Sequence, residues 1–206
     1  SETFPQLLLC VTLVHLCSNS APAQLFTAPR ERPFRMVDVV SAVADDVAFS
    51  GTARPGEFFV FQIGVKPTED VGPLSVRIAE LRSTDDGIPP ESFTCLSLQG
   101  VGHDGRSLNK NLDVSAGSVQ ILWCGIDVPK TAGGEYRGRV EVGDDQTLLG
   151  SVRLTLRVEG EAVDDHGDSV AKNLSRLRWL NSTVGSEPTI TRPFSPVEVS
   201  DHTVRI

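Results

Sequence analysis

The chain has 206 residues, with 19 Lys and Arg against 27 Asp and Glu, which gives a formal net charge of −8 at pH 7. Its length suits one domain of ordinary size with a tail. An acidic chain without a run of basic residues is a poor partner for phosphate backbones. We therefore expect neither nucleic acid nor an anionic membrane surface as a partner.

The first residues resemble an export signal. A nearly continuous apolar run covers residues 7–16 and is followed by an Ala-Pro-Ala sequence that ends at Ala23. The run is too short to span a bilayer, which needs roughly 20 apolar residues. We predict that residues 1–23 are a signal peptide and that the protein is secreted or lies in the secretory-pathway lumen. The alternative is a buried strand or helix. Because the chain opens on Ser1 without a preceding basic region, we expect it to be truncated at its front.

Alternation of apolar and polar residues with a period of two dominates from residue 35 to residue 159. The predicted strands cover residues 35–40, 47–49, 57–65, 74–81, 93–101, 118–128, 135–142 and 148–158. Successive side chains of a strand point to opposite faces, so such runs indicate half-buried antiparallel strands. In the last run, the face expected to be buried carries Leu148, Val152, Leu154, Leu156 and Val158.

Helical signals are weak, because no window of eleven or more residues holds an apolar stripe of helical period. Short strands separated by proline and glycine turns indicate a β-sandwich or barrel. We predict an all-β fold, an antiparallel β-sandwich of about eight strands over residues 31–160, with an extended C-terminal segment. Near its end, residues 127–136 resemble a turn common in extracellular sandwich modules, in which Tyr136 packs at a corner.

Export would leave two of the four cysteines, Cys95 and Cys124. An isolated pair in a small domain is a disulfide candidate in an oxidising compartment. Closing this loop would stabilise the fold by roughly 3–4 kcal/mol on the chain-entropy model. The alternative is two separate buried thiols, because both cysteines lie in strand-like runs where geometry decides.

Residues with catalytic or metal-binding chemistry lie mostly in turns. The candidate carboxylate pairs are Asp45-Asp46, Asp85-Asp86, Asp144-Asp145 and Asp164-Asp165. Aspartate is favoured in turns because its side chain accepts hydrogen bonds from nearby backbone amides. His166 and Asp168 join the last pair in a cluster that matches a calcium loop in composition but not in spacing. We predict no catalytic residue, no metal site and no cofactor.

Residues 161–169 are polar and unpatterned, which predicts a linker. The segment 161–206 is therefore interpreted as a linker and the start of a following, truncated domain. Within it, residues 197–199 and 203–205 are predicted to form a small hairpin, which alone would be only marginally stable.

The sequence NLSRLRWLNSTVG at residues 173–185 resembles the segment that follows the N-terminal β-sandwich in glycoside hydrolase family 123-like proteins. A proline-rich stretch follows in that family, and Pro188, Pro193 and Pro196 supply it here. A looser resemblance extends over residues 53–62 and 122–129. The resemblance implies a non-catalytic accessory sandwich that braces a downstream catalytic barrel of β-N-acetylgalactosaminidase type. The family's adjacent Asp-Glu pair does not occur here, so we expect no hydrolase activity from this chain alone.

Two sequons, Asn173-Leu-Ser and Asn181-Ser-Thr, predict surface glycosylation of Asn173 and Asn181 in a secreted chain. Asn181 also belongs to the family-like motif and could serve packing instead. Trp179 is the one candidate for an exposed sugar contact, but we expect it to be buried against the sandwich with Arg178 covering one edge.

A different class of function is an extracellular immunoglobulin-like adhesion module with a link between Cys95 and Cys124, or a carbohydrate-recognition module. The separation of the cysteines is short for the usual bridge between the two sheets of an immunoglobulin domain, which favours the accessory role.

Overall fold

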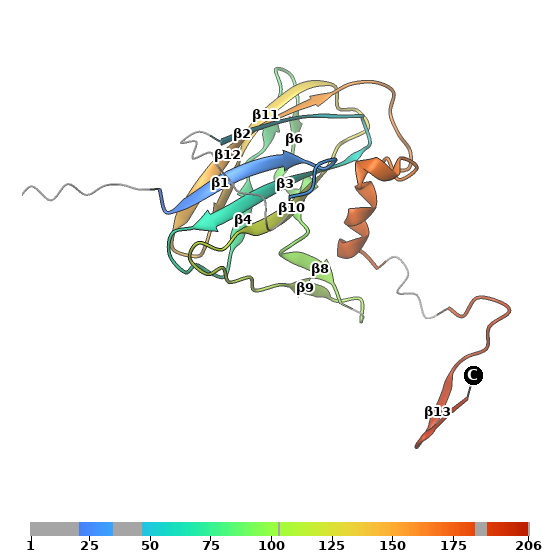
Figure 1. The fold of residues 1–206 in the computed structure, drawn as a ribbon. Coiled ribbons are helices and arrows are strands. Elements are labelled where there is room, and N and C mark those ends of the chain that lie inside the picture. Colours follow the sequence, from blue (N-terminus) through green and yellow to red (C-terminus); the bar gives the residue numbers. More distant parts are fainter. Residues whose placement is uncertain (1–20, 35–46, 103, 184–188, 206) are drawn as a thin grey trace, which may run out of the picture.

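The computed structural model describes residues 21–34, 47–102, 104–183 and 189–205, and two sheets stacked face to face form its body (Figure 1). The first sheet has the order β1 (Ala23–Pro29), β3 (Phe58–Pro67), β10 (Gln120–Asp127), β7 (Phe93–Cys95). The second has the order β2 (Val47–Ala53), β12 (Leu148–Val158), β11 (Gly134–Gly143), β5 (Leu81–Arg82), β6 (Gly87–Ile88), with β4 (Ser75–Ile78) also paired to β11. The predicted all-β sandwich is confirmed.

Strand pairing in both sheets is antiparallel, apart from the parallel pair of β2 and β12. Two short hairpins lie outside the sheets and are formed by β8 (Gln99–Val101) with β9 (Ser107–Asn109), and by β13 (Glu198–Ser200) with β14 (Thr203–Arg205). The second of these is the hairpin predicted near the C-terminus. Strand β1 lies ahead of the predicted sandwich start, whereas the strand expected at 35–40 falls outside the described residues.

The main core lies between the sheets and follows the predicted alternation, with one shift of register. Val152, Leu154, Leu156 and Val158 are buried as expected. Leu148 is exposed, and Leu149 is buried in its place. A bulge is the reason, because Gly143 pairs with Leu148 while Val142 pairs with Gly150, so the inserted residue moves the alternation to the other face.

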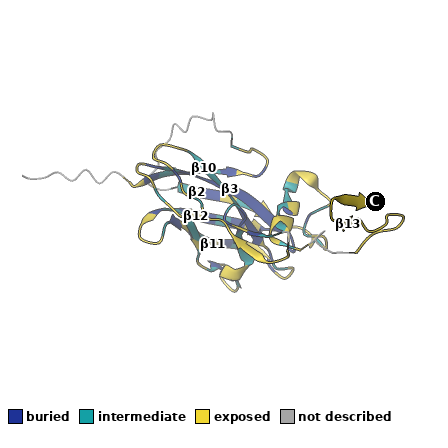
Figure 2. Cartoon of the chain, turned by 90° about the horizontal axis from the view of Figure 1, so that it is seen from below, coloured by how far each residue is buried: buried dark blue, intermediate teal, exposed yellow. Residues whose placement is uncertain are grey.

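The strand β3 is buried on both faces. Phe59, Phe61, Ile63 and Val65 face the main core, as predicted. Phe58 and Val60 belong to a second, smaller apolar cluster with Leu96, against which Trp123 and Leu177 pack. Leu177 of η3 thus covers the outer face of the first sheet at the start of β3. β3 is coloured as buried in Figure 2.

Three short 3-10 helices, η1 (Pro90–Ser92), η2 (Ala171–Asn173) and η3 (Ser175–Asn181), complete the described elements. Residues 161–169 connect β12 to η2 and are anchored to the start of β3. The N–H of Val163 donates to Pro55 O at 2.8 Å, and the N–H of Phe58 donates to His166 O at 3.0 Å. No described helix has the length and apolar character needed to cross a membrane.

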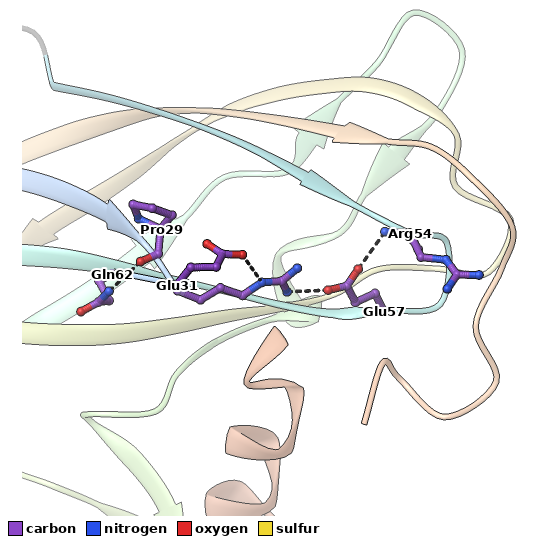
Figure 3. A network of polar contacts seen from close by, with 6 residues as sticks. Pro29, Glu31, Arg54, Glu57 and Gln62 are labelled. Carbon is purple, nitrogen blue, oxygen red and sulfur yellow. Dashed lines mark hydrogen bonds and ion pairs between the residues drawn. The ribbon is translucent and has the colours of Figure 1, made fainter. Parts of the chain in front are cut away.

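A buried polar network fixes the chain after β1 against β3 (Figure 3). Arg30 forms an ion pair with Glu57, whose second carboxylate oxygen accepts from the N–H of Arg54 at 2.9 Å. The guanidinium of Arg30 also lies 5.0 Å from the ring centroid of Phe59. Gln62 donates to Pro29 O at 2.9 Å. A charge buried this deeply is tolerated because it is paired and hydrogen-bonded.

The two cysteines lie opposite each other on β7 and β10, but the predicted disulfide is absent: both are free and buried. Strand pairing places the two residues side by side, so that a hydrogen bond between the two thiols is within reach. That hydrogen bond is the main cause of the lowered pKa of Cys95, whereas burial raises the pKa of Cys124. The disulfide prediction rested on the number of cysteines and on the expected oxidising compartment. Neither of these determines the distance and orientation of the two cysteine side chains.

Candidate functional site

The described part of the motif, residues 173–183, covers the last residue of η2, all of η3 and the two residues after η3. Leu174 joins the two helices in the left-handed conformation, with φ of 55°. In a 3-10 helix, side chains three residues apart align. Leu177 points to the second apolar cluster, and Trp179 therefore lies on a different side of η3. Trp179 is 41% exposed, so the expectation that the sandwich buries it is wrong.

A groove of about 370 Å³ lies between η3 and the ends of β7 and β10. Its lining residues are Phe58, Glu91, Ser92, Thr94, Leu96, Asp127, Arg178, Trp179, Asn181 and Ser182. An aromatic ring, two carboxylates and several hydroxyl and amide groups thus meet above an apolar floor. Pockets that bind small molecules combine an apolar surface with a few polar groups in the same way.

The indole of Trp179 is flanked by two guanidinium groups. The carbon atoms at the centres of the Arg176 and Arg178 guanidiniums lie 5.7 and 5.8 Å from its ring centroid. Arg178 is held in place by Asp168, with Nη1 2.8 Å from Oδ1. The expected contact between Arg178 and Trp179 is therefore present, and it orders one wall of the groove.

The two predicted glycosylation sites differ in environment. Asn181 is exposed at the end of η3 and lines the groove, whereas Asn173 is half-buried in η2. The side chain of Asn181 makes no hydrogen bond within the part of the chain that is described, so the packing role considered for it has no support. Glycosylation at both positions stays a prediction.

The acidic pairs serve as turn caps and surface ion pairs, except Asp45-Asp46, which lies outside the described residues. The backbone N–H groups of Gln146 and Thr147 hold the pKa of Asp144 below its usual value. Lys130 does the same for the pKa of Asp164. The general acid of a glycosidase needs a raised pKa instead, so neither carboxylate suits that role.

The acidic cluster after residue 163 does not converge. The Ser169 side chain is the main cause of the lowered pKa of Asp165, and the backbone N–H groups of Ser169 and Gly167, which donate to its carboxylate, lower it further. His166 Nδ1 lies 3.3 Å from Asp127 Oδ1, without the geometry of a hydrogen bond. Across residues 21–34, 47–102, 104–183 and 189–205, no three His, Cys, Asp or Glu side chains are grouped as metal ligands.

Sequence reasoning found Trp179, Arg178 and Asn181 but missed Glu91 and Asp127, which complete the groove. These two acids come from η1 and the end of β10, far from the motif in sequence. A single sequence carries no signal that they meet.

Comparisons with known proteins concern the fold. No family model matches this sequence, and no curated protein sequence does. The structure is similar to a family 123 glycoside hydrolase from Clostridium perfringens, with a TM-score of 0.53 and 12% identity over 68% of this chain. The chain spans 28% of the length of that enzyme.

The structure is less similar to several small β-sandwich domains. The PapD-like domain 7 of human CEP192 has a TM-score of 0.38 and 13% identity, and the match covers 80% of this chain and 99% of that domain. The fimbrial subunit MyfA from Yersinia enterocolitica has a TM-score of 0.28 and 13% identity, with coverage of 67% and 98%.

Proposed function

We propose that this chain is the non-catalytic accessory β-sandwich of a secreted glycoside hydrolase of β-N-acetylgalactosaminidase type, and that it braces a catalytic barrel following it in the same protein. The observation that carries the proposal is an apolar surface after η3 that the sandwich does not cover. The likeness of the fold to part of a family 123 glycoside hydrolase supports it.

Apolar side chains gather on residues 189–205 and remain open to solvent. The most exposed are Phe194 at 74% and Val199 at 71%, and Ile190, Val197 and Val204 are also exposed. Among the described strands, β13 and β14 pair only with each other, and their hairpin lies away from the sandwich (Figure 1) and is coloured as exposed (Figure 2). Exposed apolar residues on a segment that ends in a marginally stable hairpin support a contact with a following domain.

A second apolar surface lies on η2 and η3. A groove of about 410 Å³ there is lined mostly by apolar residues, and the full set is Asp168, Val170, Ala171, Leu174, Ser175, Arg176, Leu177, Trp179 and Leu180. Leu180 is 55% exposed. We assign this groove to the same interdomain contact, because η3 and the exposed segment 189–205 follow each other closely in sequence.

The sandwich lacks the adjacent Asp-Glu pair that the resemblance implies for the catalytic barrel. Glu91 and Asp127 line one groove, as the two carboxyl groups of a glycosidase must, but they do not form that adjacent pair. The buried carboxylate of Glu57 is held by Arg30 and by a backbone amide. We therefore propose scaffolding as the role of this chain, and the signal-like residues 1–23 and the two sequons support secretion.

The proposal is tested by Phe194→Asp in this chain and in the longer protein that carries the barrel. We expect no change in the thermal midpoint of this chain alone. In the longer protein the buried charge lowers the midpoint and the turnover of an aryl β-N-acetylgalactosaminide. Leu108→Asp, at an exposed site on β9, is the control. Equal behaviour of the two variants in the longer protein would contradict the bracing role.

A sugar-recognition module is a second candidate, favoured by the groove beside Trp179. An immunoglobulin-like adhesion module is not favoured, because Cys95 and Cys124 are neighbours in one sheet and not a link between sheets. Binding of the chain to a glycan array, abolished by Trp179→Ala, would support the sugar-recognition module.

A further inference from the structure

We infer that the groove between η3 and the ends of β7 and β10 is occupied by the protein's own glycan: Asn181 is glycosylated, and its first N-acetylglucosamine packs against Trp179. The inference rests on the part of the proposed function that places the protein in the secretory pathway. It adds the occupant of the groove, which the scaffolding role does not specify.

Asn181 is placed to deliver a sugar into this groove. Trp179 and Asn181 are two residues apart, and both line it. The helix ends at Asn181, and Ser182 is extended, with φ of −150° and ψ of 167°. The hydroxyl of Ser182 donates to Trp179 O at 2.9 Å, which fixes the turn of the sequon to the residue that carries the indole.

The groove has the chemistry that an N-acetylhexosamine requires. A pyranose ring presents an apolar face of C–H groups, and the exposed indole of Trp179 supplies a flat apolar surface for it. The hydroxyl and acetamide N–H groups of the sugar are hydrogen-bond donors. The carboxylates of Asp127 and Glu91 can accept these hydrogen bonds. Because Asp168 holds Arg178, the guanidinium beside the indole is already ordered before the sugar enters.

Two sources could supply this sugar, a free glycan or the chain's own glycan. A covalent link through Asn181 makes the contact intramolecular, so its effective concentration is in the millimolar range for a short tether. A free monosaccharide meets a shallow groove with one aromatic ring and must pay the full cost of association. The position of the sequon in the wall of the groove therefore favours the attached glycan.

Glycosylation needs a lipid-linked oligosaccharide pyrophosphate as the donor. Nδ2 of Asn181 forms the bond to the anomeric carbon, and the bond from that carbon to the pyrophosphate oxygen breaks. The lipid pyrophosphate leaves, and the amide nitrogen loses one proton, so no atom is oxidised or reduced. Thr183, the third residue of the sequon, is exposed.

Asn173 is the built-in comparison. It is half-buried, and the hydroxyl of its sequon partner Ser175 is buried without a hydrogen-bond partner. A glycan on Asn173 would have to project from a helix turn that is packed against residues 165–169. We expect glycopeptide mass spectrometry of the secreted chain to show Asn181 occupied and Asn173 occupied to a smaller extent.

The test expresses the full chain in a eukaryotic secretory pathway, trims its glycans to one N-acetylglucosamine and compares thermal midpoints before and after complete removal of the sugar. Removal is expected to lower the midpoint of the wild-type chain by about 2–4 °C. The same shift is expected for Leu180→Ala, whose side chain faces the other groove. In Trp179→Ala, removal of the sugar should leave the thermal midpoint unchanged.

Three results decide the inference. An unoccupied Asn181 in the secreted chain overturns it, and so does a sugar-dependent shift that survives Trp179→Ala. Binding of free N-acetylglucosamine to Asn181→Gln, but not to the glycosylated wild type, supports it and shows that the attached sugar fills the groove. The bracing role is judged separately, by the Phe194→Asp comparison, so the two proposals can fail independently.

Discussion

The sandwich and the segment at residues 189–205 both place apolar residues in strands, yet the two regions bury them to opposite extents. Phe61 and Ile63 on β3 are completely buried, whereas Val199 on β13 and Val204 on β14 are largely exposed. The sandwich has a second sheet to receive its apolar face, and the C-terminal hairpin has none. An alternating apolar pattern is therefore enough to predict that a strand pairs with another strand. Burial of its apolar face also requires a second layer of secondary structure that packs on that face.

The difference in burial between the two regions is tested most directly by truncating one phenylalanine in each region. Phe61→Ala removes a side chain packed between the sheets and is expected to lower the free energy of unfolding by about 3–5 kcal/mol. Phe194→Ala is the matched change at an exposed site and should stay within about 0.5 kcal/mol. Urea unfolding measures both. A similar loss for the two variants would mean that the hairpin packs on the sandwich.

A second contrast concerns ion pairs inside and outside the sandwich. Glu57→Ala leaves Arg30 buried with Glu31 as its remaining ion-pair partner and its contact to the Phe59 ring, and we expect a loss of about 3 kcal/mol. Lys130→Ala breaks a pair with Asp164 on the surface and should leave the urea midpoint unchanged. A small effect of Glu57→Ala would show that water reaches Arg30.

The tyrosine corner gives a smaller effect. The hydroxyl of Tyr136 accepts from the N–H of Gly133 at 3.2 Å, and the ring itself is buried. Tyr136→Phe removes only this hydrogen bond and is expected to cost about 1 kcal/mol. Tyr136→Ala is the comparison that also removes the ring, and its loss should be several times larger. Equal losses would assign the whole effect to the hydroxyl.

The smallest effect is expected for the thiols. Because Cys95 and Cys124 are free, a reducing agent should leave the thermal midpoint unchanged. Burial raises the pKa of Cys124, so its thiol stays protonated at neutral pH and should react with an alkylating reagent only after unfolding. A midpoint that falls on reduction would show that the disulfide forms in solution.

Much of the sandwich could be predicted from sequence, because alternation reports which strand face is buried. The pattern predicted β3, β10, β11 and β12 and the core residues on them. It failed at Leu148 and Leu149, where a bulge inserts one residue and reverses the faces. β1 was missed because it begins at Ala23, where the signal-like segment was expected to end.

The groove was only partly predictable. The motif identified Trp179, Arg178 and Asn181, which are close in sequence. Glu91 and Asp127 reach the groove through the topology of the first sheet, and no local pattern reports such a meeting. The exposure of Trp179 was predicted wrongly because Leu177 takes the inward position on η3.

Hydrogen exchange of the hairpin amides tests the central claim most directly. The measurement compares residues 198–205 in this chain with the same residues in the longer protein that includes the proposed barrel. We predict rapid exchange in the former and strong protection in the latter, with the core amides of β3 protected in both. Rapid exchange of the hairpin in both proteins would contradict the view that this sandwich braces a following domain.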